Sequence, residues 1–133
     1  MTAPLTIGTH HIGLTVSDLE ASAQFFTSLL GWKEVKHRED YPAIYVSDGK
    51  LMVTLWAVKE SPANVFDRRK NVGLHHLALQ VASAADLDKV HQTLVNHGTA
   101  IEFAPETLGP GPAKHMMCTD PSGIRIEFIW LGN

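Results

Sequence analysis

Three side chains of this 133-residue chain have the chemical types needed to hold a transition metal, and two of them recur in a repeated pattern. His11 and His76 are the second members of two histidine pairs, which open the stretches HHIGLTV at 10–16 and HHLALQV at 75–81. Glu127 lies in the hydrophobic stretch that ends the chain. Two imidazoles and one carboxylate suit a divalent transition metal and leave coordination positions open for water or substrate. The three residues therefore predict a two-His-one-Glu metal site.

The alternation of side chains along a strand places these three residues on equivalent faces. In both copies one row is apolar and should pack under a helix, whereas the row that contains His11 and His76 is small and polar, as a cavity wall would be. A histidine near a strand start is more often a surface residue than a ligand, so each histidine alone leaves that reading open. By the same parity His10 and His75 fall on the helix side and favour an edge or supporting role.

Further candidates for chemistry lie around Glu127. His115 opens a strand beside a Pro- and Gly-rich stretch and is, with Glu127, a candidate general base, because proton transfer needs a group that titrates near neutral pH. Arg125 shares the face of Glu127 and is predicted either to hold a substrate carboxylate or to pair with an acidic residue at the strand edge. Met117 is a candidate for substrate contact, or a core residue.

The strands and helices that must position these residues occur in a pattern that the sequence repeats once. Each histidine-led strand is followed by a helical stretch, at about 18–30 and 85–97, and then by three strands. Ser17 and Glu20 form a capping-box pattern before the first helix, and Ser83 and Asp86 stand at the start of the second. When the last strands of the two copies are aligned, Val53 is the residue equivalent to Glu127. A shift of the alignment by one residue would make Thr54 the equivalent residue.

The repeat predicts an α+β fold of two βαβββ modules in a single domain, 1–133. Module one covers about 7–58, a polar linker about 59–72, and module two about 73–131. The segment 105–113, PETLGPGPA, is predicted to be an irregular loop that folds over a site. A two-fold repeat of this kind suggests two modules with a site where they meet.

Composition excludes several classes of protein. The net charge is −3 with histidines neutral, so the chain lacks the basic field that attracts nucleic acid or an anionic membrane. Cys118 is the single cysteine, which permits no internal disulfide and fits a reducing compartment. The N-terminal residues do not resemble a signal peptide, and no stretch approaches the ~20 apolar residues of a membrane span. We therefore expect a cytoplasmic protein that binds neither nucleic acid nor a membrane.

The sequence resembles the vicinal oxygen chelate superfamily, which includes glyoxalase I, extradiol dioxygenases, fosfomycin-resistance enzymes and bleomycin-binding proteins. The pieces that carry the resemblance are HIGLTVSDLEASAQFFTSLLGW, HLALQV and DPSGIRIEF. It implies an open, cupped mixed sheet with helices on the convex side. Carried over by position, His11, His76 and Glu127 are the ligands of one divalent metal: Fe, Mn, Ni, Co or Zn. It also implies a homodimer with the site at or near the subunit interface, to which His11 can come from the other protomer.

The activity implied is that of a metal-dependent enzyme, a lyase or isomerase or a ring-cleaving dioxygenase, which chelates two oxygens of a small molecule. Departures from each subfamily leave the subclass open. Val53 or Thr54 replaces the fourth ligand of glyoxalase I, Met117 stands where extradiol enzymes carry a tyrosine, and Gly13 where fosfomycin enzymes carry a threonine. The alternative is a metal-independent binding protein of the bleomycin-resistance type.

Overall fold

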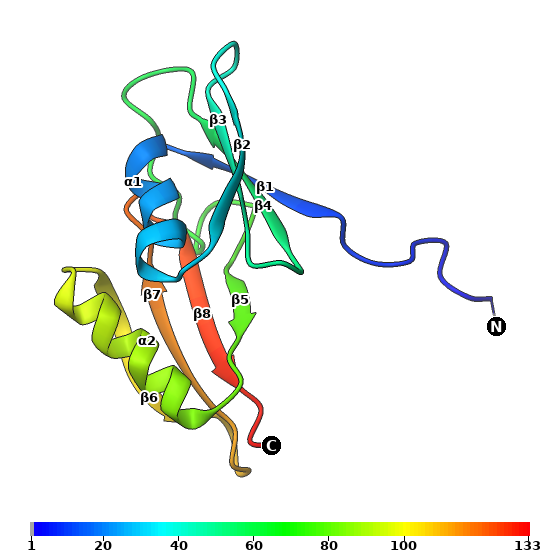
Figure 1. Cartoon of the computed structure of the whole chain (residues 1–133), viewed down its shortest axis with the longest axis vertical. Helices are drawn as coiled ribbons and strands as arrows, with labels where there is room; N and C mark the ends of the chain where they lie inside the picture. Colours follow the sequence, from blue (N-terminus) through cyan, green and yellow to red (C-terminus); the bar gives the residue numbers. More distant parts are fainter. Residues whose placement is uncertain (1) are drawn as a thin grey trace. The chain divides into compact units, whose positions relative to one another are not determined.

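The computed structural model describes residues 2–133, which form two compact units that divide between Lys59 and Glu60. Each unit has the strand–helix–strand–strand–strand order predicted from the repeat, and each builds one four-stranded mixed sheet, so the α+β fold class is confirmed (Figure 1). The elements of the first unit are β1 (His11–Val16), α1 (Leu19–Gln24), η1 (Phe25–Leu29), β2 (Lys33–Arg38), β3 (Ala43–Ser47) and β4 (Met52–Ala57).

The first sheet has the strand order β1-β4-β3-β2, with β1 parallel to β4 and the other neighbours antiparallel. Leu14 and Val16 of β1 are buried, as the sequence predicted for the apolar row of that strand, and Leu55 of β4 is buried as well. Helix α1 contacts β3 and β4. Burial of these side chains removes apolar surface from water and is the main favourable contribution to packing in the unit.

The first helix begins one residue later than the capping-box pattern predicted. Asp18 is the N-cap: its backbone is extended, and its carboxylate accepts a hydrogen bond from the Ala21 amide at 3.0 Å. The prediction of Ser17 as cap was wrong. The side chain of an N-cap residue accepts a hydrogen bond from an amide two or three residues later, and here the carboxylate of Asp18 makes that bond. The helix continues as the π-helical segment η1, which buries both Phe25 and Phe26, and Gly31 follows it with φ +76°.

The second unit repeats this plan with the strand order β5-β8-β7-β6, in which β5 and β8 are parallel. Helix α2 packs against β6, β7 and β8 (Figure 1). Its N-cap is Ser83, whose hydroxyl accepts from the Asp86 amide at 3.0 Å, as the sequence indicated. The elements are β5 (Leu77–Gln80), α2 (Ala84–Asn96), β6 (Ala100–Thr107), β7 (Lys114–Thr119) and β8 (Arg125–Trp130).

The prediction of an irregular loop over 105–113 was wrong in its first part. Strand β6 extends to Thr107 and therefore includes Pro105. The pairing of β6 with β7 shifts register between Phe103 and Glu106, which leaves room for a proline that cannot donate to the ladder. The connection is thus short, and the Leu108 amide donates to the Ala113 carbonyl across it at 2.8 Å.

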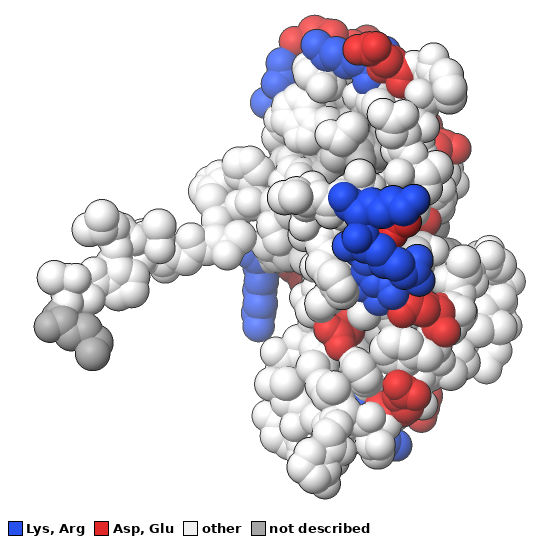
Figure 2. Space-filling view, turned by 180° about the vertical axis from the view of Figure 1, so that it is seen from behind, with Lys and Arg blue, Asp and Glu red and all other residues white. Residues whose placement is uncertain are grey.

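The surface agrees with the low net charge. On the face that Figure 2 shows, the blue Lys and Arg side chains have red Asp and Glu side chains beside them, so neither sign covers that face as one field. None of the helices within residues 2–133 has the length and apolar character needed to cross a membrane.

Candidate functional site

Glu127 is the central residue of the candidate site in the second unit. It lies in β8, between β5 and β7, where its register partners are Ala78 and Met117. Residues opposite one another in a sheet share a face, so the carboxylate projects beside a methyl group and a thioether. Glu127 is only 9% exposed. A carboxylate this buried needs hydrogen-bond or ionic partners to offset the loss of water.

Two histidines lie against this carboxylate. His115 from β7 places Nδ1 2.5 Å from Oε2 of Glu127, and His76, just before β5, places Nε2 3.3 Å from Oε1. The His115 ring lies against Phe103, with 4.8 Å between ring centroids, and its Nε2 is 3.9 Å from a carboxylate oxygen of Glu106. The structure thus brings together three of the predicted site residues, His76, His115 and Glu127.

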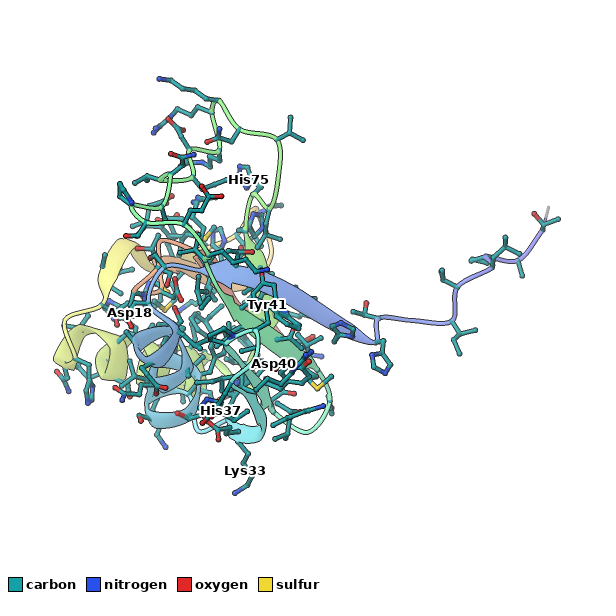
Figure 3. The ribbon with its side chains drawn as sticks, turned by 90° about the horizontal axis from the view of Figure 1, so that it is seen from above. Asp18, Lys33, His37, Asp40, Tyr41 and His75 are labelled. Carbon is teal, nitrogen blue, oxygen red and sulfur yellow. The ribbon has the colours of Figure 1, made fainter. Side chains whose placement is uncertain are left out.

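A second set of contacts continues from His76 to the edge of the sheet. His75, labelled in Figure 3, places Nδ1 2.8 Å from Nδ1 of His76. The guanidinium of Arg125 approaches His75 from β8, with Nη1 3.1 Å from Nδ1 and 3.2 Å from the carbonyl oxygen. Partial desolvation of the ring and the charge of Arg125 lower the pKa of His75, which favours its neutral form.

Arg125 is held in place by a carboxylate. Its Nε and Nη2 donate to the two carboxylate oxygens of Glu102 at 3.1 and 2.9 Å, a bidentate pair. These hydrogen bonds lower the pKa of Glu102 and so keep it ionised. Arg125 therefore has the acidic partner at the strand edge that was the alternative expectation for it. Contact between Arg125 and a substrate remains a prediction, as does contact between a substrate and Met117, which is 5% exposed.

His11, the third predicted ligand, belongs to the first unit. It is exposed, and its Nδ1 lies 2.8 Å from Nδ1 of His10. The described residues, 2–133, contain no group of three or more His, Cys, Asp or Glu side chains arranged to hold a metal. Nδ1 of His115, the ring nitrogen nearest Glu127, is engaged by Oε2 of that carboxylate.

The donor atoms present in the second unit nevertheless fit a metal. Oε1 of Glu127 and Nε2 of His76 lie 3.3 Å apart, and the His76 side chain is 34% exposed. A carboxylate oxygen and an unprotonated imidazole nitrogen at this distance repel each other unless a cation, a shared proton or a water molecule that donates to both lies beside them. Imidazole nitrogen with carboxylate oxygen is also a donor set that transition metals bind well. The second unit therefore offers two of the three predicted ligands.

The sheet registers identify the counterpart of Glu127 in the first unit. Ala78 pairs with Glu127, and the equivalent Gly13 pairs with Thr54, so Thr54 and not Val53 occupies the fourth-ligand position. Thr54 is 1% exposed, and its hydroxyl accepts a hydrogen bond from Trp56 Nε1 at 2.8 Å. Val53 instead lies in the buried apolar row.

Sequence reasoning did not assign a partner to His75 or any role to Glu102. Two signals in the sequence could have drawn attention to these residues: the repeated histidine pair, and the shared face of Arg125 and Glu127. The contacts themselves join residues that are 23 and 50 positions apart, Glu102 and His75 with Arg125. Separations of this size lie beyond any local pattern.

Comparisons with known proteins agree with this fold. The model of the Glyoxalase/Bleomycin resistance protein/Dioxygenase superfamily matches residues 8–128. A catechol-2,3-dioxygenase of Bacillus subtilis is 31% identical over 121 residues, which are 88% of this chain and 40% of that protein. A probable trivalent organoarsenical cleaving enzyme of the same organism is 30% identical over 121 residues, 90% of this chain and 77% of that protein.

A solved structure is similar over almost the full length. The crystal structure of a glyoxylase/bleomycin resistance protein/dioxygenase domain from Frankia sp. EAN1pec superimposes with a TM-score of 0.83 at 30% identity. The alignment covers 96% of this chain and 99% of that one. The paired modules are therefore shared with a protein of closely similar length.

Proposed function

Because the chain belongs to the Glyoxalase/Bleomycin resistance protein/Dioxygenase superfamily, we propose that it is a divalent-metal-dependent enzyme acting on a small oxygenated molecule. The observation that carries the proposal is the buried carboxylate of Glu127, flanked by His76 and His115. A carboxylate between two imidazoles has the side-chain types used for metal binding and for general acid–base catalysis. Relatives named as a dioxygenase and as an organoarsenical cleaving enzyme support the assignment to enzymes.

The residues divide into two roles in this proposal. His76 and Glu127, with His11 as the third ligand, would hold the metal, which when bound supplies Lewis-acid stabilisation of negative charge on two substrate oxygens. His115 holds a hydrogen bond to Oε2 of Glu127 at 2.5 Å and so orients the carboxylate. Oε1 of Glu127, when it is released from the metal, would be a base that can take a proton from the substrate, and His115 is the other candidate base.

The subclass of reaction follows from the metal. Fe(II) would favour ring-cleaving dioxygenation, whereas Ni(II) or Zn(II) would favour lyase or isomerase chemistry. Thr54 at the fourth-ligand position supplies no carboxylate, which leaves more coordination positions for substrate than a four-ligand site would. We further propose that the protein is a cytoplasmic homodimer with the site at or near the subunit interface.

A second function is supported by the family itself. The matching family model includes bleomycin resistance proteins, which supports the alternative of a metal-independent protein that binds a small molecule or antibiotic. Such a protein would bind its ligand equally well after chelation and would not turn it over.

Metal analysis of the purified protein separates the two functions. Freshly prepared protein is expected to contain about one divalent transition metal per chain, and the variants His76→Ala and Glu127→Gln are expected to lose it. His97→Ala is the matched control, because His97 caps the end of α2, where its Nδ1 lies 2.8 Å from the Thr93 carbonyl oxygen. Wild-type protein that takes up none of the five metals, or variants that retain the wild-type content, would overturn the metal-dependent function.

A further inference from the structure

The hydrogen bonds around His75 have a direction, because one of the groups in them can only donate. A guanidinium has five N–H donors and no acceptor. Nδ1 of His75, 3.1 Å from Nη1 of Arg125, must therefore act as an acceptor in this contact. A ring nitrogen that accepts carries no proton.

This assignment determines the next contact. Nδ1 of His75 and Nδ1 of His76 lie 2.8 Å apart, and two unprotonated nitrogens cannot form a hydrogen bond. The proton in this contact must then belong to Nδ1 of His76. A neutral imidazole carries one proton, so Nε2 of His76 is left with a free lone pair, and this is the atom 3.3 Å from Oε1 of Glu127.

We propose that Arg125 is a positioning residue that fixes the tautomer of His76 through His75, so that Nε2 is presented unprotonated beside Glu127. Glu102 holds the guanidinium in the required orientation through its bidentate pair. The order of the chain is Glu102, Arg125, His75, His76 and Glu127. The consequence for metal binding rests on the proposed function, whereas the tautomer itself does not.

The first unit contains the same histidine pair without this device. Nδ1 of His10 and Nδ1 of His11 are also 2.8 Å apart. The sheet registers identify the position equivalent to Arg125. Ile126 pairs with Leu77 in the second unit, as Val53 pairs with Ile12 in the first. The residue before Ile126 is Arg125, and the residue before Val53 is Met52. A thioether donates no hydrogen bond, so either nitrogen of the first pair can hold the proton. The two modules therefore differ in whether a neighbouring arginine fixes which ring nitrogen of the histidine carries the proton.

Nitrogen-15 NMR of histidine-labelled, metal-free protein tests the tautomer directly. At a pH where the rings are neutral, long-range ¹H–¹⁵N spectra of wild type are expected to show Nδ1 protonated and Nε2 unprotonated in His76. Arg125→Met, which copies the first unit, is expected to move His76 toward the Nε2–H tautomer. His75→Ala should do the same, since it removes the acceptor from an exposed position.

Arg68→Met is the matched control. Arg68 acts on His75 only through its charge, so its loss should leave the His76 tautomer unchanged. Wild-type His76 with its proton on Nε2 would overturn the inference. So would the wild-type tautomer in both Arg125→Met and His75→Ala, provided that circular dichroism shows both variants folded.

Competition titration with Zn(II) and a chelating dye tests the consequence for the site. Loss of a group that orients a metal-ligating histidine costs about 10–100-fold in metal affinity, and we expect a decrease of this size in Arg125→Met. Unchanged affinity in that variant would overturn the role in metal binding. If wild type binds no metal but His76 shows the expected tautomer, the proposed function fails and the positioning role of Arg125 stands.

Discussion

The interaction of Glu127 with His115 is the shortest contact in the candidate site and the one that best explains how a carboxylate is tolerated there. Both side chains are largely buried, 12% and 15% exposed, so neither can rely on water. Removal of one partner from such a pair leaves the other without compensation, which is costlier than removal of both. The pair is therefore a unit, in stability as well as in the proposed chemistry.

This coupling predicts a non-additive pair of substitutions. His115→Phe preserves packing against Phe103 but removes the hydrogen bond, and it should lower the free energy of unfolding by about 2 kcal/mol. His115→Phe combined with Glu127→Met should recover part of that loss, because no buried charge remains. Urea unfolding of the metal-free proteins measures both values. A double variant that is less stable than the single variant by the full cost of Glu127→Met would show that the two residues act independently.

At the scale of elements, the two modules share a plan and differ in what they carry. Glu127, His115 and Arg125 all lie on β7 and β8 of the second unit. The registers place Thr54, Ala43 and Met52 at the equivalent positions of β3 and β4. The two sheets are thus similar, but within residues 2–133 the Glu127–His115 pair has no counterpart at the matched positions of the first sheet. Under the proposed function, module one would supply His11.

The beginning of α1 provides a test of the local reading of helix ends. Because Asp18 accepts the Ala21 amide, Asp18→Ala should destabilise the protein by about 1 kcal/mol. Ser17→Ala should have little effect, although the sequence pattern named Ser17. Ser83→Ala in the second unit should cost about as much as Asp18→Ala, since Ser83 makes the equivalent hydrogen bond. The midpoints of thermal unfolding compare the three variants, and a larger shift for Ser17→Ala than for Asp18→Ala would contradict the assignment.

At the scale of the whole molecule, the proposed homodimer raises the question of which chain supplies His11. Complementation between two defective variants answers it. If His11 and Glu127 of one site come from different chains, a mixture of His11→Ala and Glu127→Gln protein, refolded together, should form heterodimers with one intact site in two. The metal content of those heterodimers should then reach about half of the wild-type value.

The same experiment has a clear contrary result. If both ligands of a site come from one chain, each site in the heterodimer lacks one ligand, and the mixture should bind no more metal than either variant alone. Separate refolding of each variant is the control. Size-exclusion chromatography with light scattering checks the assembly itself, and a monomer at working concentrations would remove the basis for an interface site.

Much of the fold follows from the sequence because its signals are local. Alternating polarity marked the strands, Ser83 marked the start of the second helix, and the repeated histidine pair revealed the two modules. These features depend on residues a few positions apart, where backbone geometry alone relates side chains. The placement of Glu127 on the face opposite the apolar row follows from strand parity for the same reason.

The tertiary structure decided what the long-range contacts determine. The register of β1 with β4 selects Thr54 over Val53, because a register depends on how two strands pair across a long connection and not on either strand alone. The pairing of Arg125 with Glu102 and His75 likewise depends on which edges of the sheet are neighbours. By itself the sequence determined which residues could do chemistry and on which faces they lie. The fold decided which partners each of them has, since those partners are brought together only when the strands pair into a sheet.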